Sequence, residues 1–96
     1  MPTYVTLLKW TQKGIENVKE SPTRLDKVKA AIKAAGGQFK AFYMLMGRYD
    51  MLLISEAPTD EAYAKTILAA TSAGAVSTET LRAFTEDEYR RIIGSL

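Results

Sequence analysis

The residues of this chain with the most obvious potential for chemistry are a tyrosine and a carboxylate beside a glycine turn. Tyr49 and Asp50 directly follow Gly47 and Arg48, and apolar runs flank these four residues on both sides. Aspartate is depleted in strands and a buried carboxylate needs partners, so Asp50 has two interpretations. Either it accepts hydrogen bonds from backbone or from a hydroxyl such as that of Thr6 and thereby fixes the turn, or it is a ligand-binding or acid–base carboxylate with a shifted pKa.

Aromatic side chains form a second group of candidates. Along Thr3–Trp10, Tyr4 and Trp10 share one side with Thr6 and Leu8, because the side chains of a strand alternate between two faces. Such a surface can line a pocket for a flat or apolar small molecule, or it can pack in a core or a dimer contact. The residues that we predict for ligand binding are Tyr4, Trp10, Tyr43, Tyr49 and Asp50.

Several reaction types are excluded by composition. The 96 residues include no histidine and no cysteine, which removes thiol catalysis, Cys/His zinc sites, iron–sulfur clusters and any imidazole base. The acidic run Glu86–Glu88 is explained by the start of a helix rather than by calcium, and no glycine-rich phosphate loop is present. We therefore predict no cofactor and no metal, and the sequence leaves open whether the protein is an enzyme.

Size and charge indicate one small domain. A chain of 96 residues with a net charge of +2 fits a single core, so we expect residues 1–96 to form one domain. Residues 1–48 carry nine Lys and Arg against three Asp and Glu, and residues 49–96 carry four against eight. The bases are spaced along predicted helices and interleaved with acids, which is typical of a solvated helix face rather than a tail for nucleic acid.

The start of the chain and its apolar runs bear on where the protein is found. The first eight residues have no basic segment before an apolar run, so we expect no signal peptide. No stretch approaches the roughly 20 apolar residues of a membrane span. We therefore expect a cytoplasmic protein without membrane contacts.

These residues must be positioned by strands and helices that the pattern predicts in alternation. Thr11 can cap a short helical turn, which Gly14 weakens, and Ser21 can cap a longer helix with Pro22 in its first turn. Thr59 and Thr85 can cap two more helices, the last with a capping box to Glu88. The third of these helices is rich in alanine, so we expect it to approach a sheet closely. The predicted strands are Thr3–Trp10, Gln38–Met46, Asp50–Glu56 and Val76–Phe84.

The order of the elements predicts an α+β fold. Strand, helix, strand, strand, helix, strand is the ferredoxin-like βαββαβ arrangement, with a four-stranded antiparallel sheet, helices on one face, and an added C-terminal helix. Right-handed crossovers place the first and third strands centrally, and these are the runs that are apolar on both faces. The polar run Val76–Phe84 suits an edge strand.

A two-residue hairpin loop at Gly47-Arg48 predicts the register of the second and third strands. Tyr43 then lies opposite Leu52, on the same face as Phe39 and Asp50, whereas Tyr49 falls on the other face. The register therefore keeps Tyr49 and Asp50 apart unless a bulge intervenes. Both faces are apolar, so we predict a homodimer, or a higher oligomer, that packs sheet against sheet.

The run Gly47-Arg48-Tyr49-Asp50, followed by an apolar strand ending in Ala57-Pro58, resembles the GYD-domain family. The opening Tyr4–Thr11 and the following Gly14-Ile15 are also similar to that family, and the likeness covers nearly the whole chain. The resemblance implies the fold of the dimeric α+β barrel superfamily and self-association, and it implies no particular reaction.

We predict a homo-oligomeric module that binds a small organic molecule. The alternative is a cofactor-independent enzyme of the α+β barrel kind, a monooxygenase or isomerase, in which Asp50 or a tyrosine moves a proton. The turn also resembles the effector-binding domains of Lrp/AsnC regulators, which implies effector sensing together with a separate DNA-binding partner. Nucleic-acid binding of the RNA-recognition type is disfavoured, because the third strand, Met51–Ile54, offers no aromatic side chain for stacking.

Overall fold

The strands and helices alternate as the sequence predicts. The computed structural model describes all 96 residues. Its elements are β1 (Thr3–Trp10), α1 (Gln12–Glu16), the 3-10 helix η1 (Val18–Glu20), α2 (Ser21–Ala34), β2 (Gln38–Met44), β3 (Met51–Glu56), α3 (Asp60–Thr71), β4 (Val76–Ala83) and α4 (Glu86–Gly94).

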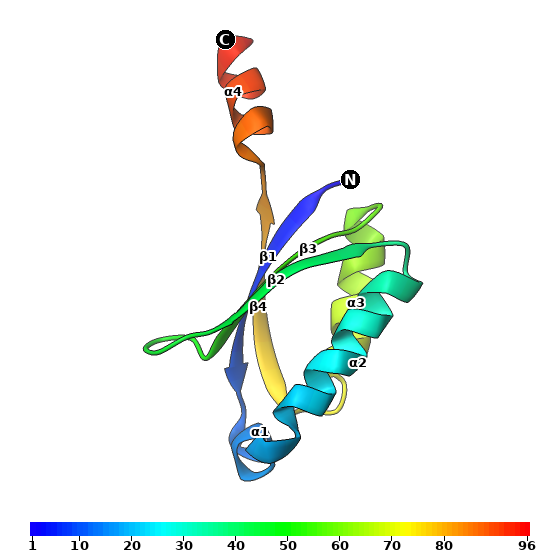
Figure 1. The fold of residues 1–96 in the computed structure, drawn as a ribbon, viewed down its shortest axis with the longest axis vertical. Helices are drawn as coiled ribbons and strands as arrows, with labels where there is room; N and C mark the ends of the chain where they lie inside the picture. The colour runs from blue at the N-terminus through cyan, green and yellow to red at the C-terminus, as the bar shows by residue number, and fades with distance from the viewer.

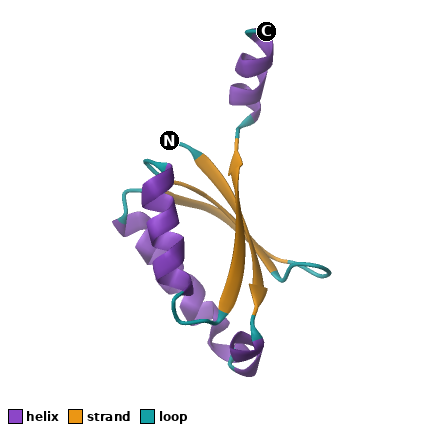
Figure 2. Ribbon diagram, turned by 180° about the vertical axis from the view of Figure 1, so that it is seen from behind, coloured by secondary structure: helices purple, strands orange, loops and turns teal.

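The four strands form one antiparallel sheet in the order β2-β3-β1-β4. The predicted central strands, β1 and β3, are the inner pair, and the polar strand β4 is an edge. Helices α2 and α3 cover one face of the sheet, and the other face has no covering layer (Figures 1 and 2). The ferredoxin-like α+β fold is therefore confirmed.

The core lies between the sheet and the two helices, in two clusters of buried side chains. Because alternate residues of a strand point to the same side, even-numbered residues of β1 and odd-numbered residues of β3 face the helices. One cluster consists of Leu8, Ile32, Met51 and Leu53, and the other of Tyr4, Ala57, Tyr63 and Ile67.

The predicted hairpin register holds near the turn and fails at the far end. Tyr43 lies opposite Leu52 as expected, but a bulge between Phe39 and Ala41 shifts the pairing, so that Phe39 lies opposite Ser55. The prediction that Phe39 shares a face with Tyr43 is therefore wrong. An extra residue in one strand reverses the alternation, and Phe39 gains packing against the helix-side core.

The connection between β2 and β3 is also wider than predicted. The strands end at Met44 and Met51, so residues 45–50 form the loop. Leu45 still faces Asp50, because its N–H donates to the Asp50 carbonyl over 2.8 Å. Gly47 has φ +115°, a conformation that side-chain-bearing residues rarely adopt. The loop extends toward the side of the sheet that the helices leave open (Figure 1).

Threonine caps explain where three helices begin. The hydroxyls of Thr11, Thr59 and Thr85 accept hydrogen bonds from the first turns of α1, α3 and α4, and Thr85 forms the predicted capping box. The prediction that Ser21 caps α2 is wrong. Glu20 occupies the N-cap position, and the Ser21 hydroxyl instead accepts a hydrogen bond from the indole N–H of Trp10 in β1.

The C-terminal helix stands apart from the rest of the molecule. After β4 the chain continues along the long axis, and α4 projects beyond the sheet (Figures 1 and 2). Its apolar side chains Tyr89, Ile92 and Ile93 are about half exposed, as is Phe84 just before it. No helix of the chain has the length and apolar character needed to cross a membrane.

Candidate functional site

A cavity of about 510 Å³ lies between the sheet and the two covering helices. Twelve of its sixteen lining residues are hydrophobic. The sheet contributes Leu8 and Leu53, α2 contributes Val28, and α3 contributes Ala69 and Ala70. Ligand pockets in proteins are of this size and are mostly apolar, so this cavity is the candidate binding site.

The alanines of α3 explain why the space exists. We expected them to let the helix approach the sheet closely, but Ala69 and Ala70 line the cavity instead, as does Ala73 just after the helix. A methyl side chain reaches only a short distance from the helix, so it leaves a gap that a leucine would fill. Ala31 on α2 acts in the same way.

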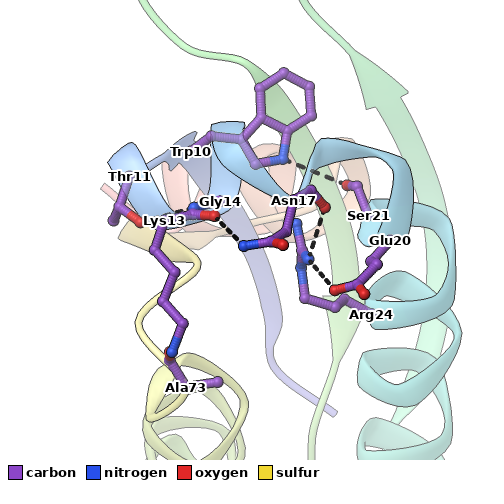
Figure 3. Close-up of polar contacts among 9 residues, drawn as sticks. All are labelled: Trp10, Thr11, Lys13, Gly14, Asn17, Glu20, Ser21, Arg24 and Ala73. Carbon is purple, nitrogen blue, oxygen red and sulfur yellow. Dashed lines mark hydrogen bonds and ion pairs between the residues drawn. The ribbon is translucent and has the colours of Figure 1, made fainter.

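Contacts from the start of α1 hold the loop after α3, whose residues Ala73 and Ala75 line the cavity. The Lys13 ammonium donates to the Ala73 carbonyl over 2.9 Å (Figure 3), and the Thr11 N–H donates to the Ala75 carbonyl over 3.0 Å. Gly14 makes this approach possible, because a Cβ there would lie 1.9 Å from the Ala75 oxygen. The glycine that we expected only to weaken this helix is a packing requirement.

Four polar residues, Glu20, Ser21, Arg24 and Lys27, line the cavity where η1 meets α2. Arg24 is fixed by contacts with neighbouring residues. Its Nη1 donates to the Asn17 carbonyl over 3.2 Å and lies 3.8 Å from a Glu20 carboxylate oxygen (Figure 3). Its Nη2 is buried and has no hydrogen-bond partner, and it is the one buried side-chain nitrogen or oxygen in the chain in that state.

Trp10 connects this site to a second, smaller cavity. Its indole N–H donates to the Ser21 hydroxyl over 3.3 Å (Figure 3). The second cavity, of about 280 Å³, is lined by Trp10 and shares Ser21, Leu25, Phe42 and Met51 with the first. Of the five residues that the sequence predicts for ligand binding, Trp10 is the one that borders either cavity.

Tyr4 is buried in a hydroxyl network on the helix-covered face. Its ring stacks on Tyr63 with centroids 4.3 Å apart, and its hydroxyl donates to the Asp60 carboxylate. Burial, together with that hydrogen bond, raises the pKa of Tyr4 to about 12. The Tyr63 hydroxyl bonds Thr6 Oγ1 at 2.6 Å and accepts from Ser55 at 3.1 Å. These polar groups are partnered within the fold and lie outside both cavities.

Asp50 forms hydrogen bonds with the backbone of β1. One of its carboxylate oxygens accepts from the Trp10 N–H over 2.9 Å, and its own N–H donates to the Leu8 carbonyl over 2.9 Å. The pairing of β1 with β3 ends at Leu8 and Met51, so the carboxylate takes the place of a strand acceptor that β3 no longer supplies. These contacts match the structural interpretation of Asp50, although its partner is Trp10 rather than Thr6.

The other two predicted residues face the open side of the sheet. The Tyr49 hydroxyl donates to a Glu79 carboxylate oxygen over 2.9 Å, which raises the pKa of Tyr49 above its ordinary value, and Lys9 lies over its ring. The prediction that Tyr49 lies on the opposite face from Tyr43 is therefore wrong, because the wider loop releases Tyr49 from the strand alternation. Tyr43 is 59% exposed on the same open side. Tyr49 and Asp50 do not form a dyad.

Sequence reasoning missed Arg24 and the alanines of α3. The charge pattern places Arg24 on a solvated helix face, and nothing in the spacing of the bases distinguishes it from Lys27. The available signal was the pair of small residues Ala69 and Ala70 near the end of one helix, with Ala73 just after it. Within the whole chain, no group of three or more acidic side chains lies close enough to hold a metal ion.

This antiparallel sheet, covered by helices on one face only, has the ferredoxin-like α+β fold. The chain is similar in fold to MtbAldR, with a TM-score of 0.69 at 13% identity, over 88% of this chain and about half (52%) of that one. It is also similar to SnoaB, a cofactor-independent oxygenase from Streptomyces nogalater, with a TM-score of 0.57 at 14% identity, over 88% of this chain and 92% of that one. At these identities the likeness concerns the fold alone.

The chain belongs to the GYD-domain family, whose pattern matches residues 4–93. A Thermus thermophilus protein named glutamine synthetase and cystathionine beta-lyase binding protein is 32% identical over 84 residues, which are 86% of this chain and 88% of that protein. The resemblance inferred from the Gly47–Asp50 turn is confirmed.

Proposed function

We propose that this chain is a homo-oligomeric, single-domain module that binds a small organic molecule in the cavity between its sheet and its helices. The observation that carries the proposal is the cavity of about 510 Å³, lined mostly by apolar side chains. A site of this kind binds by shape and burial and demands no catalytic group.

Self-association is supported by the amount of surface that the isolated chain exposes. Its accessible surface is 6525 Å², whereas a compact monomer of this mass exposes about 5,500 Å². The excess is about the area that each partner of a standard protein interface buries, roughly 800 Å². The radius of gyration, 14.3 Å, likewise exceeds the value of about 12.5 Å expected for a compact chain of this length.

The surface that would be covered is the open face of the sheet together with α4. Leu81 and Tyr43 are about half exposed on that face, and Ile92 and Ile93 are equally exposed on α4. A helix of nine residues gains too little from its own hydrogen bonds to be stable alone, so its apolar side needs a partner. We propose a second copy of the chain, packed sheet against sheet, as that partner.

Native mass spectrometry of protein purified without denaturation tests both parts of the proposal. An oligomer that retains a small molecule would support both. A bare oligomer that also binds no apolar probe in the cavity would overturn the binding role, and a monomer at micromolar concentration would overturn the assembly.

A cavity-filling pair of variants gives a sharper test of the site. Ala70→Leu adds volume inside the cavity, whereas Ala64→Leu adds the same atoms to an exposed position of the same helix. We expect Ala70→Leu to abolish binding of an apolar probe and Ala64→Leu to leave it unchanged. Equal binding by both variants would show that the probe binds elsewhere.

A protein-binding role is the second candidate. It rests on the Thermus thermophilus relative, whose name states that it binds glutamine synthetase and cystathionine beta-lyase, and on the exposed apolar side of α4. Purified glutamine synthetase and cystathionine beta-lyase can be tested for complexes with this chain by size-exclusion chromatography. A complex that Ile92→Arg disrupts would favour this role, and absence of any complex with either enzyme would count against it.

The position of the bound ligand distinguishes two further possible functions, a cofactor-independent enzyme and an effector-sensing domain. A cofactor-independent enzyme needs a proton-moving group beside the substrate, and neither Asp50 nor Tyr4 lines the cavity. Effector sensing of the Lrp/AsnC kind places the ligand at contacts between subunits, so binding would change the oligomeric state. Unchanged subunit number on ligand binding would favour the simple binding module.

A further inference from the structure

We propose that the cavity is a site for an amphiphilic carboxylate, with an aliphatic chain among the apolar side chains and a head group at Arg24. This inference rests on the proposed small-molecule site and adds the chemical class of its ligand. It follows from three features: the lining of the apolar space, the position of the polar residues, and the incomplete bonding of one guanidinium.

The apolar part of the main cavity is lined mostly by aliphatic side chains. The main cavity and its smaller neighbour share Ser21, Leu25, Phe42 and Met51, so the two lie side by side at the start of α2. Phe42 is the one aromatic residue of the main cavity. Leucine, alanine and methionine surfaces adapt to a flexible chain better than to a rigid flat ring. The main cavity, of about 510 Å³, therefore suits a flexible alkyl chain.

The polar residues of the cavity are confined to one end. Glu20, Ser21, Arg24 and Lys27 all belong to η1 or the first two turns of α2, and the remaining lining residues are apolar. A ligand that fills the space must therefore have its polar group at one end only. Two of these four side chains are cations and one is an anion, so the local charge favours a negative head group.

Arg24 supplies the specific contact. Its Nη1 is engaged by the Asn17 carbonyl, and its ion pair with Glu20 is long, 3.8 Å, to a side chain that is 72% exposed. The buried Nη2 lacks any acceptor. A buried donor without a partner is unfavourable, and a carboxylate is the acceptor that guanidinium groups bind best. A ligand carboxylate at this end would complete the bonding of Arg24 as Glu20 moves into solvent.

The test compares probes with the same chain and different heads. Binding of decanoate, decanol and decyltrimethylammonium to the oligomeric protein can be followed by the fluorescence of Trp10, the single tryptophan, which hydrogen-bonds the cavity residue Ser21. We expect decanoate to bind about ten- to a hundredfold more tightly than decanol, the range that one charged hydrogen-bonded pair supplies. The cationic probe should bind least.

Variants assign the preference to one side chain. Arg24→Gln should remove the advantage of decanoate over decanol, and Arg24→Lys should keep part of it, because a lysine retains the charge but loses the planar fork. Arg48→Gln, at the exposed hairpin loop, is the matched loss of a positive charge and should change nothing. Retained decanol binding shows that the Arg24→Gln protein is folded.

The outcomes separate this inference from the function on which it rests. If decanoate and decanol bind equally, and Arg24→Gln affects neither, the anionic ligand is wrong while the cavity remains a binding site. If no probe binds, or if Ala70→Leu leaves all binding intact, the small-molecule site itself is refuted. A decanoate preference that survives in Arg24→Gln would also overturn the assignment to this residue.

Discussion

Replacing Asp50 tests whether the carboxylate beside the Gly47 turn is structural. In the folded chain one of its oxygens accepts the Trp10 N–H at 2.9 Å, beyond the last paired residues of β1 and β3. Asp50→Ala removes this acceptor and leaves a partly buried N–H without a partner. Asp50→Asn keeps an oxygen at the same place but removes its charge.

The size of the effect follows from the kind of bond. A hydrogen bond to a charged group contributes about 1.5–3 kcal/mol, and a neutral one about 1 kcal/mol. We therefore expect Asp50→Ala to lower the free energy of unfolding by about 2 kcal/mol and Asp50→Asn by about 1 kcal/mol. With a urea m-value of about 1–2 kcal/mol/M, Asp50→Ala should lower the unfolding midpoint by about 1–2 M.

Urea unfolding, followed by circular dichroism at one fixed protein concentration, measures these differences, because the midpoint of an oligomer depends on concentration. Asp26→Ala, an exposed carboxylate of α2, is the control and should stay within about 0.5 kcal/mol of the parent. If Asp50→Ala unfolds at the same urea concentration as the control, the carboxylate does not hold the turn. If both Asp50 variants are fully stable yet lose ligand binding, Asp50 is a binding residue and the structural interpretation is wrong.

Three further predictions concern packing, pH and assembly. Gly14→Ala should destabilise the chain by about 1–3 kcal/mol through overpacking against the loop after α3, whereas Gly94→Ala, with open space around its Cβ, should be neutral or slightly stabilising in thermal melts. The pKa of Tyr4 is raised to about 12, so the stability that its neutral hydroxyl contributes is complete below pH 10 and is lost as the pH rises through about 12. In urea titrations across this pH range, the parent should therefore lose more stability than Tyr4→Phe. Parallel alkaline stability curves for the two proteins would refute this prediction. Ile92→Arg should shift the oligomer toward smaller species in analytical ultracentrifugation, and an unchanged distribution would exclude α4 from the assembly.

Local features of the sequence were enough to predict the fold. Alternating apolar residues defined the four strands, and the requirement for right-handed crossover connections then placed β1 and β3 at the centre of the sheet. Thr59 and Thr85 capped α3 and α4 where expected, because capping depends on a hydroxyl and the next three residues. The Gly47–Asp50 turn identified the family for the same reason, since a turn is specified by adjacent residues.

The register was predictable only near the turn. Hairpin pairing propagates outward from the loop, so Tyr43 and Leu52 were placed correctly. The bulge beside Ala41 moved Phe39 to the other face, and no local signal announced it, because the bulge is favoured by distant packing against the helix-side core. The wider loop released Tyr49 to the open side in the same way.

The candidate site could not be predicted because it is a property of layers rather than of neighbours in the chain. The sequence determined that the protein has a sheet with two apolar faces, two covering helices and no histidine or cysteine chemistry. The tertiary structure decided which face the helices cover, that Ala69 and Ala70 leave a cavity beneath α3, and that the guanidinium of Arg24 ends there without a full set of partners. Arg24 becomes a candidate ligand contact only because it borders a cavity whose other walls come from elements far away in sequence.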